Sequence, residues 1–151
     1  MDHHTPSEHI AKLMYTYAER IDAGDFAGVA DVFAAATLTF EGFGDGVTGR
    51  KAVQSLYERT TRRYENGTPR TKHVITNVIV DVADDGASAT SRSSFTVLQA
   101  VPGALALQPI IAGRYHDAFA CVQGQWQFTA VHIIIDLVGD LGHHMLLDVI
   151  P

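Results

Sequence analysis

Apolar residues in the first part of the chain recur every three or four positions, which is the spacing of a helix with one buried face. The residues that follow this spacing are Ile10, Leu13, Met14, Tyr17 and Ile21. Thr5 and Glu8 form a capping-box pattern around Pro6, and Gly24 supplies a stop signal. We therefore predict a first helix that begins after Thr5 and ends near Asp22, one position past the apolar stripe.

The next stretch of the chain alternates between helix and turn signals. A short second helix is expected over residues 25–32, because its first residue is an aspartate that can cap it. Residues 36–43 have the composition of a strand, and the glycine-rich residues 42–49 are predicted as a loop. Thr48 is placed to cap a third helix over residues 50–64.

Strand signals dominate after residue 70, where β-branched residues are frequent. The predicted strands span residues 71–82, 87–100, 110–122 and 125–135, with residues 105–109 in a connection. Strict alternation in the first of them separates His73, Ile75, Asn77 and Ile79 on one face from Val74, Thr76, Val78 and Val80 on the other. This order predicts an α+β fold in which a long, curved antiparallel sheet wraps around N-terminal helices. We expect one domain over residues 1–151, with residues 136–151 as a C-terminal tail or flap.

Composition and charge narrow the range of functions. The 151 residues carry a net charge of -6, from 17 acidic and 11 basic residues. No basic stripe is present to contact phosphates, so we expect neither nucleic acid nor an anionic membrane as a partner. No apolar stretch is long enough to cross a membrane, and the first residues lack the pattern of a secretory signal, so we expect a cytoplasmic protein.

Histidines and the single cysteine do not form a recognisable metal motif. His3, His4 and His9 lie near one end of the chain and His143 and His144 near the other, without a set spacing to cysteine or carboxylate ligands. Cys121 has no partner for a disulfide. The glycine-rich residues 42–46 also lack the context of a phosphate-binding loop. We therefore expect no metal and no cofactor.

Three segments together resemble a known family. They are RIDAGDFAGVADVF at 20–33, TFEGFGDGVTGRKAV at 39–53 and GRYHDAFACVQGQWQFTAVH at 113–132. Their order is similar to the SnoaL-like branch of the nuclear-transport-factor-2-like (NTF2-like) superfamily, over about residues 7–135. The resemblance implies a cone-shaped, cystatin-like α+β barrel, a fold that hosts both enzymes and binding modules.

Within that branch the chain is nearest in motif to scytalone dehydratases and hexachlorocyclohexane dehydrochlorinases. These enzymes use an aspartate at the end of the first helix and a histidine that opens the long strand, which Asp22 and His73 match. Asn77 matches an asparagine of the dehydrochlorinases, whereas Ile21 and Gly42 stand where the dehydratases have tyrosines. The resemblance therefore implies the histidine–aspartate pair without implying the dehydratase substrate.

The chemistry implied by this resemblance is proton removal from carbon. Neutral imidazole is a suitable base near neutral pH, so His73 is assigned as the catalytic base and Asp22 as the residue that orients it. Asn77 or Tyr115 could polarise the substrate. The other residues expected to line an apolar substrate pocket are Tyr17, Tyr57, Phe95, Phe128 and His132. Because His116 and Asp117 are adjacent on a strand, we expect one of them to face the cavity.

These observations leave three hypotheses open. The first is a cofactor-free lyase or isomerase that acts on a small apolar cyclic substrate. The second is a non-catalytic small-molecule-binding or assembly module of the same fold. The third is a β-type subunit of a ring-hydroxylating dioxygenase. The open face of the sheet needs covering, so we also expect a homodimer or homotrimer.

Overall fold

The structure is a computed structural model, and it describes residues 2–146. Its helices are α1 (Pro6–Asp22), α2 (Phe26–Val32) and α3 (Arg50–Thr60). Its strands are β1 (Thr37–Phe40), β2 (Phe43–Thr48), β3 (Thr71–Val82), β4 (Ser88–Val101), β5 (Leu105–Val122) and β6 (Gln125–Val138). The six strands form one sheet in the order β2-β1-β6-β5-β4-β3.

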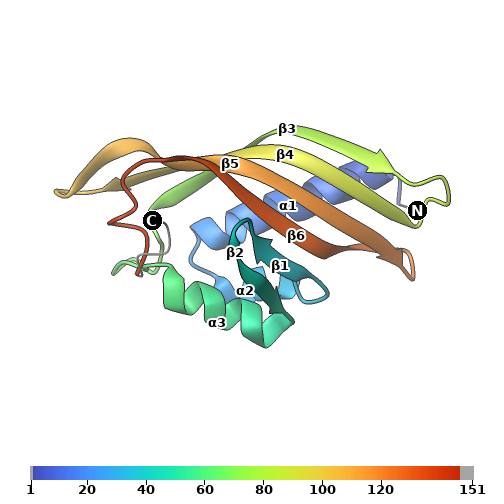
Figure 1. The fold of residues 1–151 in the computed structure, drawn as a ribbon, viewed down its shortest axis with the longest axis horizontal. Helices are drawn as coiled ribbons and strands as arrows, with labels where there is room; N and C mark the ends of the chain where they lie inside the picture. Colours follow the sequence, from blue (N-terminus) through green and yellow to red (C-terminus); the bar gives the residue numbers. More distant parts are fainter. Residues whose placement is uncertain (1, 147–151) are drawn as a thin grey trace.

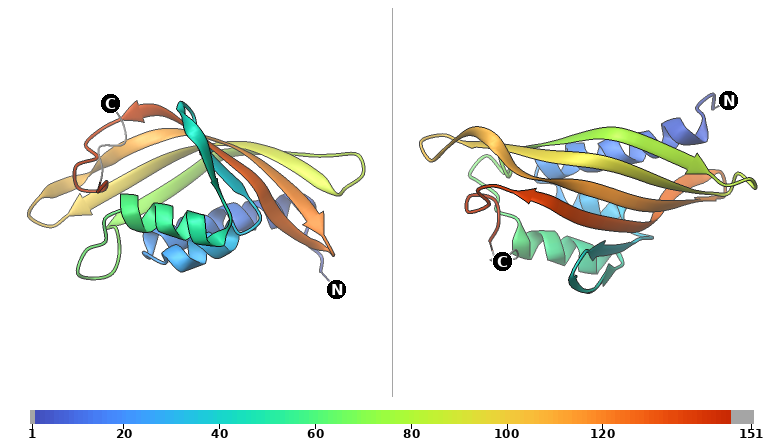
Figure 2. Two further views of the ribbon diagram at one scale, coloured as in Figure 1. Left: turned by 60° about the horizontal axis from the view of Figure 1, so that its bottom comes forward. Right: turned by 45° about the horizontal axis from the view of Figure 1, so that its top comes forward.

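The sheet arches over the helices and leaves a concave face toward them (Figure 1). In both views of Figure 2 the three helices lie on the same side of the sheet, with the β1–β2 hairpin at one edge. β3, β4, β5 and β6 are antiparallel neighbours, whereas β1 runs parallel to β6. The α+β prediction is therefore confirmed, with the correction that the curved sheet is mixed and is not closed into a complete barrel.

The ends of the first two helices follow from the local sequence. The Thr5 side chain accepts a hydrogen bond from the Glu8 backbone N–H, and the Glu8 side chain accepts one from the Thr5 backbone. Asp25 caps α2 in a similar way through the backbone N–H of Gly28. These caps satisfy N–H groups that the first turn of a helix leaves unpaired. They confirm the predicted starts, and α1 ends at Asp22 with Ala23 as its C-cap.

Three predictions for residues 42–64 are wrong. Residues 43–48 form strand β2 instead of a loop, and this strand pairs with β1 in a hairpin. α3 ends at Thr60 rather than near Tyr64. Its N-cap is Gly49, because the Thr48 side chain instead pairs with Thr37 across the hairpin. Glycines at positive φ angles make this strand possible although its composition is typical of a loop.

The long strands extend further than the sequence indicated. β5 begins at Leu105, so residues 105–109 belong to a strand, and β6 continues to Val138, so the C-terminal tail starts later than predicted. β3 contains a bulge at Asn77, which has a φ angle of 55°. The bulge reverses the alternation, so Val78 and Val80 pack toward the core while Ile79 is exposed. The predicted face assignment is therefore correct only up to Thr76.

The core lies between the helices and the concave face of the sheet. It is dominated by aromatic and branched side chains, of which the largest fully buried ones include Phe26, Phe33, Phe119 and Phe128. No helix among residues 2–146 is long and apolar enough to cross a membrane. The outer face of the sheet leaves Val74 and Ile79 partly exposed, and the prediction of a homodimer or homotrimer stays a prediction.

Candidate active site

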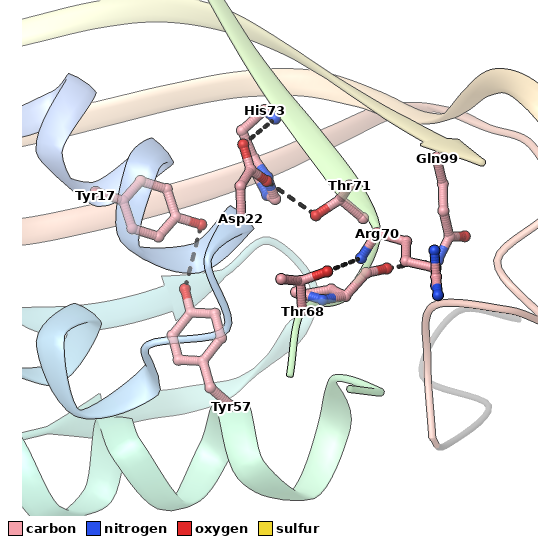
Figure 3. Close-up of polar contacts among 9 residues, drawn as sticks. Tyr17, Asp22, Tyr57, Thr68, Arg70, Thr71, His73 and Gln99 are labelled. Carbon is pink, nitrogen blue, oxygen red and sulfur yellow. Dashed lines mark hydrogen bonds and ion pairs between the residues drawn. The ribbon is translucent and has the colours of Figure 1, made fainter. Parts of the chain in front are cut away.

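Asp22 and His73 meet where the end of α1 approaches the start of β3 (Figure 3). The His73 Nδ1–H donates to Asp22 Oδ1 at 2.6 Å, and the backbone N–H of His73 donates to Oδ2 at 2.8 Å. The Thr71 hydroxyl also donates to Oδ1, at 2.9 Å. Side-chain exposure is only 7% for His73 and 13% for Asp22, so this carboxylate replaces its water shell with three protein donors.

Strand periodicity explains why these groups converge. Thr71 and His73 are two residues apart on β3 and therefore point to the same face, toward the last turn of α1. Because both Asp22 oxygens are fixed by donors from one strand, the carboxylate locks the orientation of the imidazole ring. With Nδ1 holding the proton, Nε2 remains as the nitrogen that can accept a proton from the cavity side.

His73 opens onto a main cavity of about 430 Å³ between the helices and the sheet. Its aliphatic walls include Ile21, Leu38, Val97, Ile111 and Ile133. Its aromatic walls are Tyr17, Phe40, Phe43, Tyr57, Phe95 and Tyr115. This volume and this mostly apolar lining suit a small cyclic molecule.

Three tyrosines bring their rings into this cavity from different elements. The Tyr57 hydroxyl on α3 donates to the Tyr17 hydroxyl on α1 at 3.4 Å (Figure 3), and the rings of Tyr17 and Tyr115 meet edge to face at 6.2 Å. Tyr17 also packs edge to face on His73 at 5.9 Å. The phenols therefore lie close to one another and border the imidazole of the pair.

Burial keeps these phenols neutral. It is the main cause that raises the pKa of Tyr17, Tyr57 and Tyr115 well above the usual range, with a further contribution from the neighbouring tyrosines. A neutral phenol retains an O–H that can donate to an oxygen of a bound ligand. The tyrosine group is thus a source of hydrogen-bond donors in an otherwise apolar wall.

Tyr115 depends on a glycine beside it. Phe95 on β4 stacks on the Tyr115 ring with a centroid distance of 4.4 Å, and it lies opposite Gly113 on β5. A Cβ added at Gly113 would lie 2.9 Å from the Phe95 ring and 2.0 Å from the Ile134 carbonyl oxygen. The absence of a side chain at this position lets the two rings stack against the cavity.

A family model described as the SnoaL-like domain matches residues 5–132, most of the chain. The chain belongs to the SnoaL-like family. The match includes α1 and the first residues of β3, which supply the two members of the Asp22–His73 pair, and it ends within β6. A search of curated proteins found no match to this SnoaL-like chain.

Solved structures support the fold of this SnoaL-like protein. A candidate scytalone dehydratase from Novosphingobium aromaticivorans is 22% identical, with a TM-score of 0.69 over 88% of this chain and 85% of its own. An NTF2-like protein with a cystatin-like fold from the same organism is 19% identical, with a TM-score of 0.68 over 85% and 80%. ActVI-ORFA from Streptomyces coelicolor is 18% identical, with a TM-score of 0.69 over 85% and 96%. At these identities the likeness shows the fold alone.

Three residues predicted to line the pocket lie elsewhere in the SnoaL-like domain. Asn77 is exposed at the bulge in β3, where its amide donates to Ser94 at 3.5 Å. His132 points to the other face of β6 and hydrogen-bonds the Thr39 hydroxyl at 2.7 Å. Phe128 is fully buried below the main cavity and packs on Phe33. The structure brings together His73, Asp22, Tyr17, Tyr57, Phe95 and Tyr115.

Asp117 lies on the inward face of β5, and His116 lies on the outward face. Asp117 is 5% exposed, and its Oδ1 has no hydrogen-bond partner among the described residues. It borders a second cavity of about 10 Å³ beneath the tyrosines. Burial raises the pKa of Asp117 to about 8, so this carboxyl is mostly neutral at pH 7.

The C-terminal segment, which was predicted as a tail or flap, contributes three residues to the cavity wall. Leu141, His144 and Met145 all line the main cavity. No pattern in the sequence indicates that His144 lies in this wall. No three side chains of His, Cys, Asp or Glu gather into a metal-binding group within residues 2–146.

Proposed function

We propose that this protein is a lyase or isomerase in which His73 removes a proton from a carbon atom of a small apolar cyclic substrate. The observation that carries the proposal is the 2.6 Å hydrogen bond from His73 Nδ1 to Asp22 beside an apolar cavity. In this proposal the imidazole carries its proton on Nδ1, and Nε2 is the base. Proton transfer to imidazole requires no metal or nucleotide, so the reaction we propose is independent of a cofactor.

The proposed step conserves atoms and charge. The C–H bond of the substrate breaks, its proton moves to His73 Nε2, and its electron pair forms a carbon–carbon double bond in an enol or enolate. In an isomerisation the imidazolium returns the proton to another carbon. In an elimination, the electron pair expels a leaving group from the adjacent carbon. Asp22 stabilises the imidazolium in both cases, and the apolar walls strengthen that attraction by excluding water.

The tyrosines supply the second part of the proposed mechanism. An enolate gathers negative charge on the oxygen of the former carbonyl group. Hydrogen-bond donors that are already in place for that charge lower the barrier. Tyr57 donates its O–H to Tyr17, and Tyr17 and Tyr115 are neutral phenols in the same cavity as His73 that could donate to such an oxygen, which supports a carbonyl-bearing substrate.

Replacement of His73 tests this function. The assay follows deuterium uptake from deuterated water by 2-tetralone, a cyclic ketone with an acidic carbon beside its carbonyl. We expect the enzyme to accelerate this exchange, and His73→Ala to lower the acceleration by about 10²–10⁴-fold, the usual contribution of a general base. His116→Ala removes an exposed imidazole from the outer face of the sheet and should have no effect.

Circular dichroism of the His73→Ala variant checks that the fold is intact. Full exchange activity in a folded His73→Ala protein would disprove the assignment of His73. Binding of 2-tetralone without any acceleration by the wild-type protein would instead favour the binding-module hypothesis, which the mostly apolar cavity walls also support.

A further inference from the structure

The opening of the main cavity lies beside strand β2. Residues 43–47 all line the cavity, and β2 is at one edge of the sheet (Figure 2). Among the described residues that line the cavity, the exposed ones are Phe43, Gly44, Asp45 and Gly46, whereas all the others are buried or half-buried. A ligand that enters from solvent therefore passes this strand.

β2 is anchored near its two ends. Just before it, the Glu41 N–H donates to the Ile133 carbonyl oxygen on β6 at 2.9 Å. At the other end, the hydroxyl groups of Thr37 and Thr48 form a hydrogen bond of 2.9 Å. The residues that line the cavity lie between these two fixed points, so a displacement of these residues leaves the hairpin attached to the sheet.

The bulged part of β2 is weakly held. Residues 44–46 lie opposite the single residue Thr39 of β1, so the ladder of hydrogen bonds between the two strands is interrupted. No atom lies within 4 Å of the position that a Cβ would take at Gly42 or Gly44. This part of the strand therefore has neither a continuous ladder nor packing around these two glycines, and such segments open at a low cost in free energy.

The C-terminal segment, which forms another part of the cavity wall, is held more firmly. It follows β6 and turns back toward the end of α3 (Figures 1 and 2). Arg62 N–H donates to the His144 carbonyl oxygen at 2.8 Å, and Leu146 N–H donates to the Thr60 carbonyl oxygen at 2.9 Å. Because these backbone bonds tie the segment to the chain around the end of α3, we place the movable part of the wall in β2.

Phe43 is the large apolar side chain at this opening. It lines the cavity, but 42% of its surface is exposed. The other exposed lining residues are two glycines and an aspartate, which have no apolar side chain to place over a ligand. When Phe43 packs on an apolar ligand, apolar surface of both leaves water, which favours closure. Closure also excludes water from the Asp22–His73 pair.

We propose that residues 42–47 are a lid on the main cavity and that Phe43 closes over the bound ligand. The lid opens when its bulged part moves away from the cavity, and it shuts when Phe43 packs on an apolar molecule inside. Phe43 thereby joins the residues that contact and position the ligand. This movement concerns binding alone, so it does not depend on proton removal by His73.

NMR of the backbone amides tests the movement. Order parameters and relaxation dispersion together cover fast loop motion and slower opening. In the free protein we expect the amides of residues 43–47 to have order parameters below about 0.6 or to show dispersion, and those of Arg62 and Leu146 to show neither. Saturation with prodan, a neutral fluorescent naphthalene ketone, should make the amides of residues 43–47 as rigid as those of the long strands, because the lid is then shut.

Stopped-flow fluorescence tests the role of Phe43. The emission of prodan depends on the polarity of its surroundings, so it reports entry into the cavity and release from it. We expect Phe43→Ala to release prodan about tenfold faster than the wild type, since the contacts made on closure are lost. Phe43→Leu keeps an apolar side chain and should restore most of the difference. The matched control is Tyr15→Ala, which removes an aromatic residue of similar exposure from α1, away from the cavity, and should leave the release rate unchanged.

Three outcomes would overturn the lid. Rigid amides without dispersion at residues 43–47 of the free protein would show that β2 is a fixed wall. Motion at Arg62 and Leu146 instead would place the movable part in the C-terminal segment. An unchanged release rate in a folded Phe43→Ala protein would show that this side chain does not close over the ligand. Failure of the proposed function looks different, because 2-tetralone would then show no accelerated deuterium exchange while the lid still moved.

Discussion

Asp22 at the end of helix α1 is half-buried and Asp117 on strand β5 is buried, and the surroundings of the two carboxyl groups are opposite. Asp22 accepts three hydrogen bonds from Thr71 and His73 at the start of β3. Asp117 makes no hydrogen bond to the described side chains and faces a small second cavity beneath the tyrosines. A carboxylate with three donors can act as a fixed negative charge, whereas one without donors is held as a neutral acid. The hydrogen-bond donors around an aspartate, and not the residue type alone, therefore determine whether it acts as a fixed charge or as a neutral acid.

Asp22→Asn is the variant for which we expect the largest effect on the rate of deuterium exchange. The amide keeps the shape but offers one accepting oxygen to three donors, so His73 should turn or change its tautomer. Loss of the base form should lower deuterium exchange of 2-tetralone by about as much as loss of His73 itself, up to about 10⁴-fold, as in other pairs where the orienting carboxylate is neutralised. Deuterium uptake measured by mass spectrometry checks this expectation.

Asp31→Asn is the matched control for that variant. Asp31 lies on α2 in an exposed ion pair with Arg50, which contributes little to stability or to the cavity. Its replacement should leave the exchange rate unchanged. If Asp22→Asn also left the rate unchanged, the pair would be structural and the binding-module hypothesis would gain support.

Asp117→Asn tests, through the pH dependence of stability, whether Asp117 is a neutral acid in the folded protein. The pKa of Asp117 is about 8 in the folded protein and about 3.9 in an unfolded chain. Between these values the folded state holds a proton that the unfolded state has lost, so stability decreases as pH rises from about 4 to about 8. Asn cannot ionise, so this variant should be more stable than the wild type at pH 8, by on the order of a few kcal/mol.

Urea unfolding at several pH values measures this difference. The gain should shrink as pH falls toward 4, because the carboxyl of the unfolded wild-type chain then also takes up a proton. Asp84→Asn, in the exposed turn after β3, is the control and should show no pH-dependent gain. A gain for Asp117→Asn that is independent of pH would show that burial does not keep this carboxyl protonated.

The sequence predicted Asp22 and His73 because their positions depend on local rules and on a family pattern. The capping box fixes where α1 begins, the stop at Gly24 fixes where it ends, and strand periodicity aims His73 inward. Tyr115 and Asp117 are two residues apart on β5, so the same periodicity predicts that Asp117 points inward if Tyr115 does. The inward position of Asp117 can therefore be predicted from the sequence.

Other parts of the site depend on features that local rules do not contain. The register of β3 shifts at Asn77, which has a positive φ angle. No residue type in this part of the sequence predicts such a bulge. His144 reaches the cavity only because the C-terminal segment pairs with the chain after α3, at Thr61 and Met145. Contacts between segments so distant in the chain follow from the completed fold, which a reading of local patterns does not supply.

Thr71→Val gives the smallest expected effect, because it removes only one of the three donors to Asp22. The Thr71 side chain is buried and valine has nearly the same shape, so packing should be preserved. The two bonds from His73 would remain and keep the carboxylate oriented. We expect about a tenfold or smaller decrease in exchange rate and a loss of about 1 kcal/mol in stability. Thr76→Val, on an exposed position of β3, corrects for the higher strand propensity of valine. A decrease as large as that of Asp22→Asn would mean that the Thr71 hydroxyl, rather than the backbone of His73, determines where the carboxylate points.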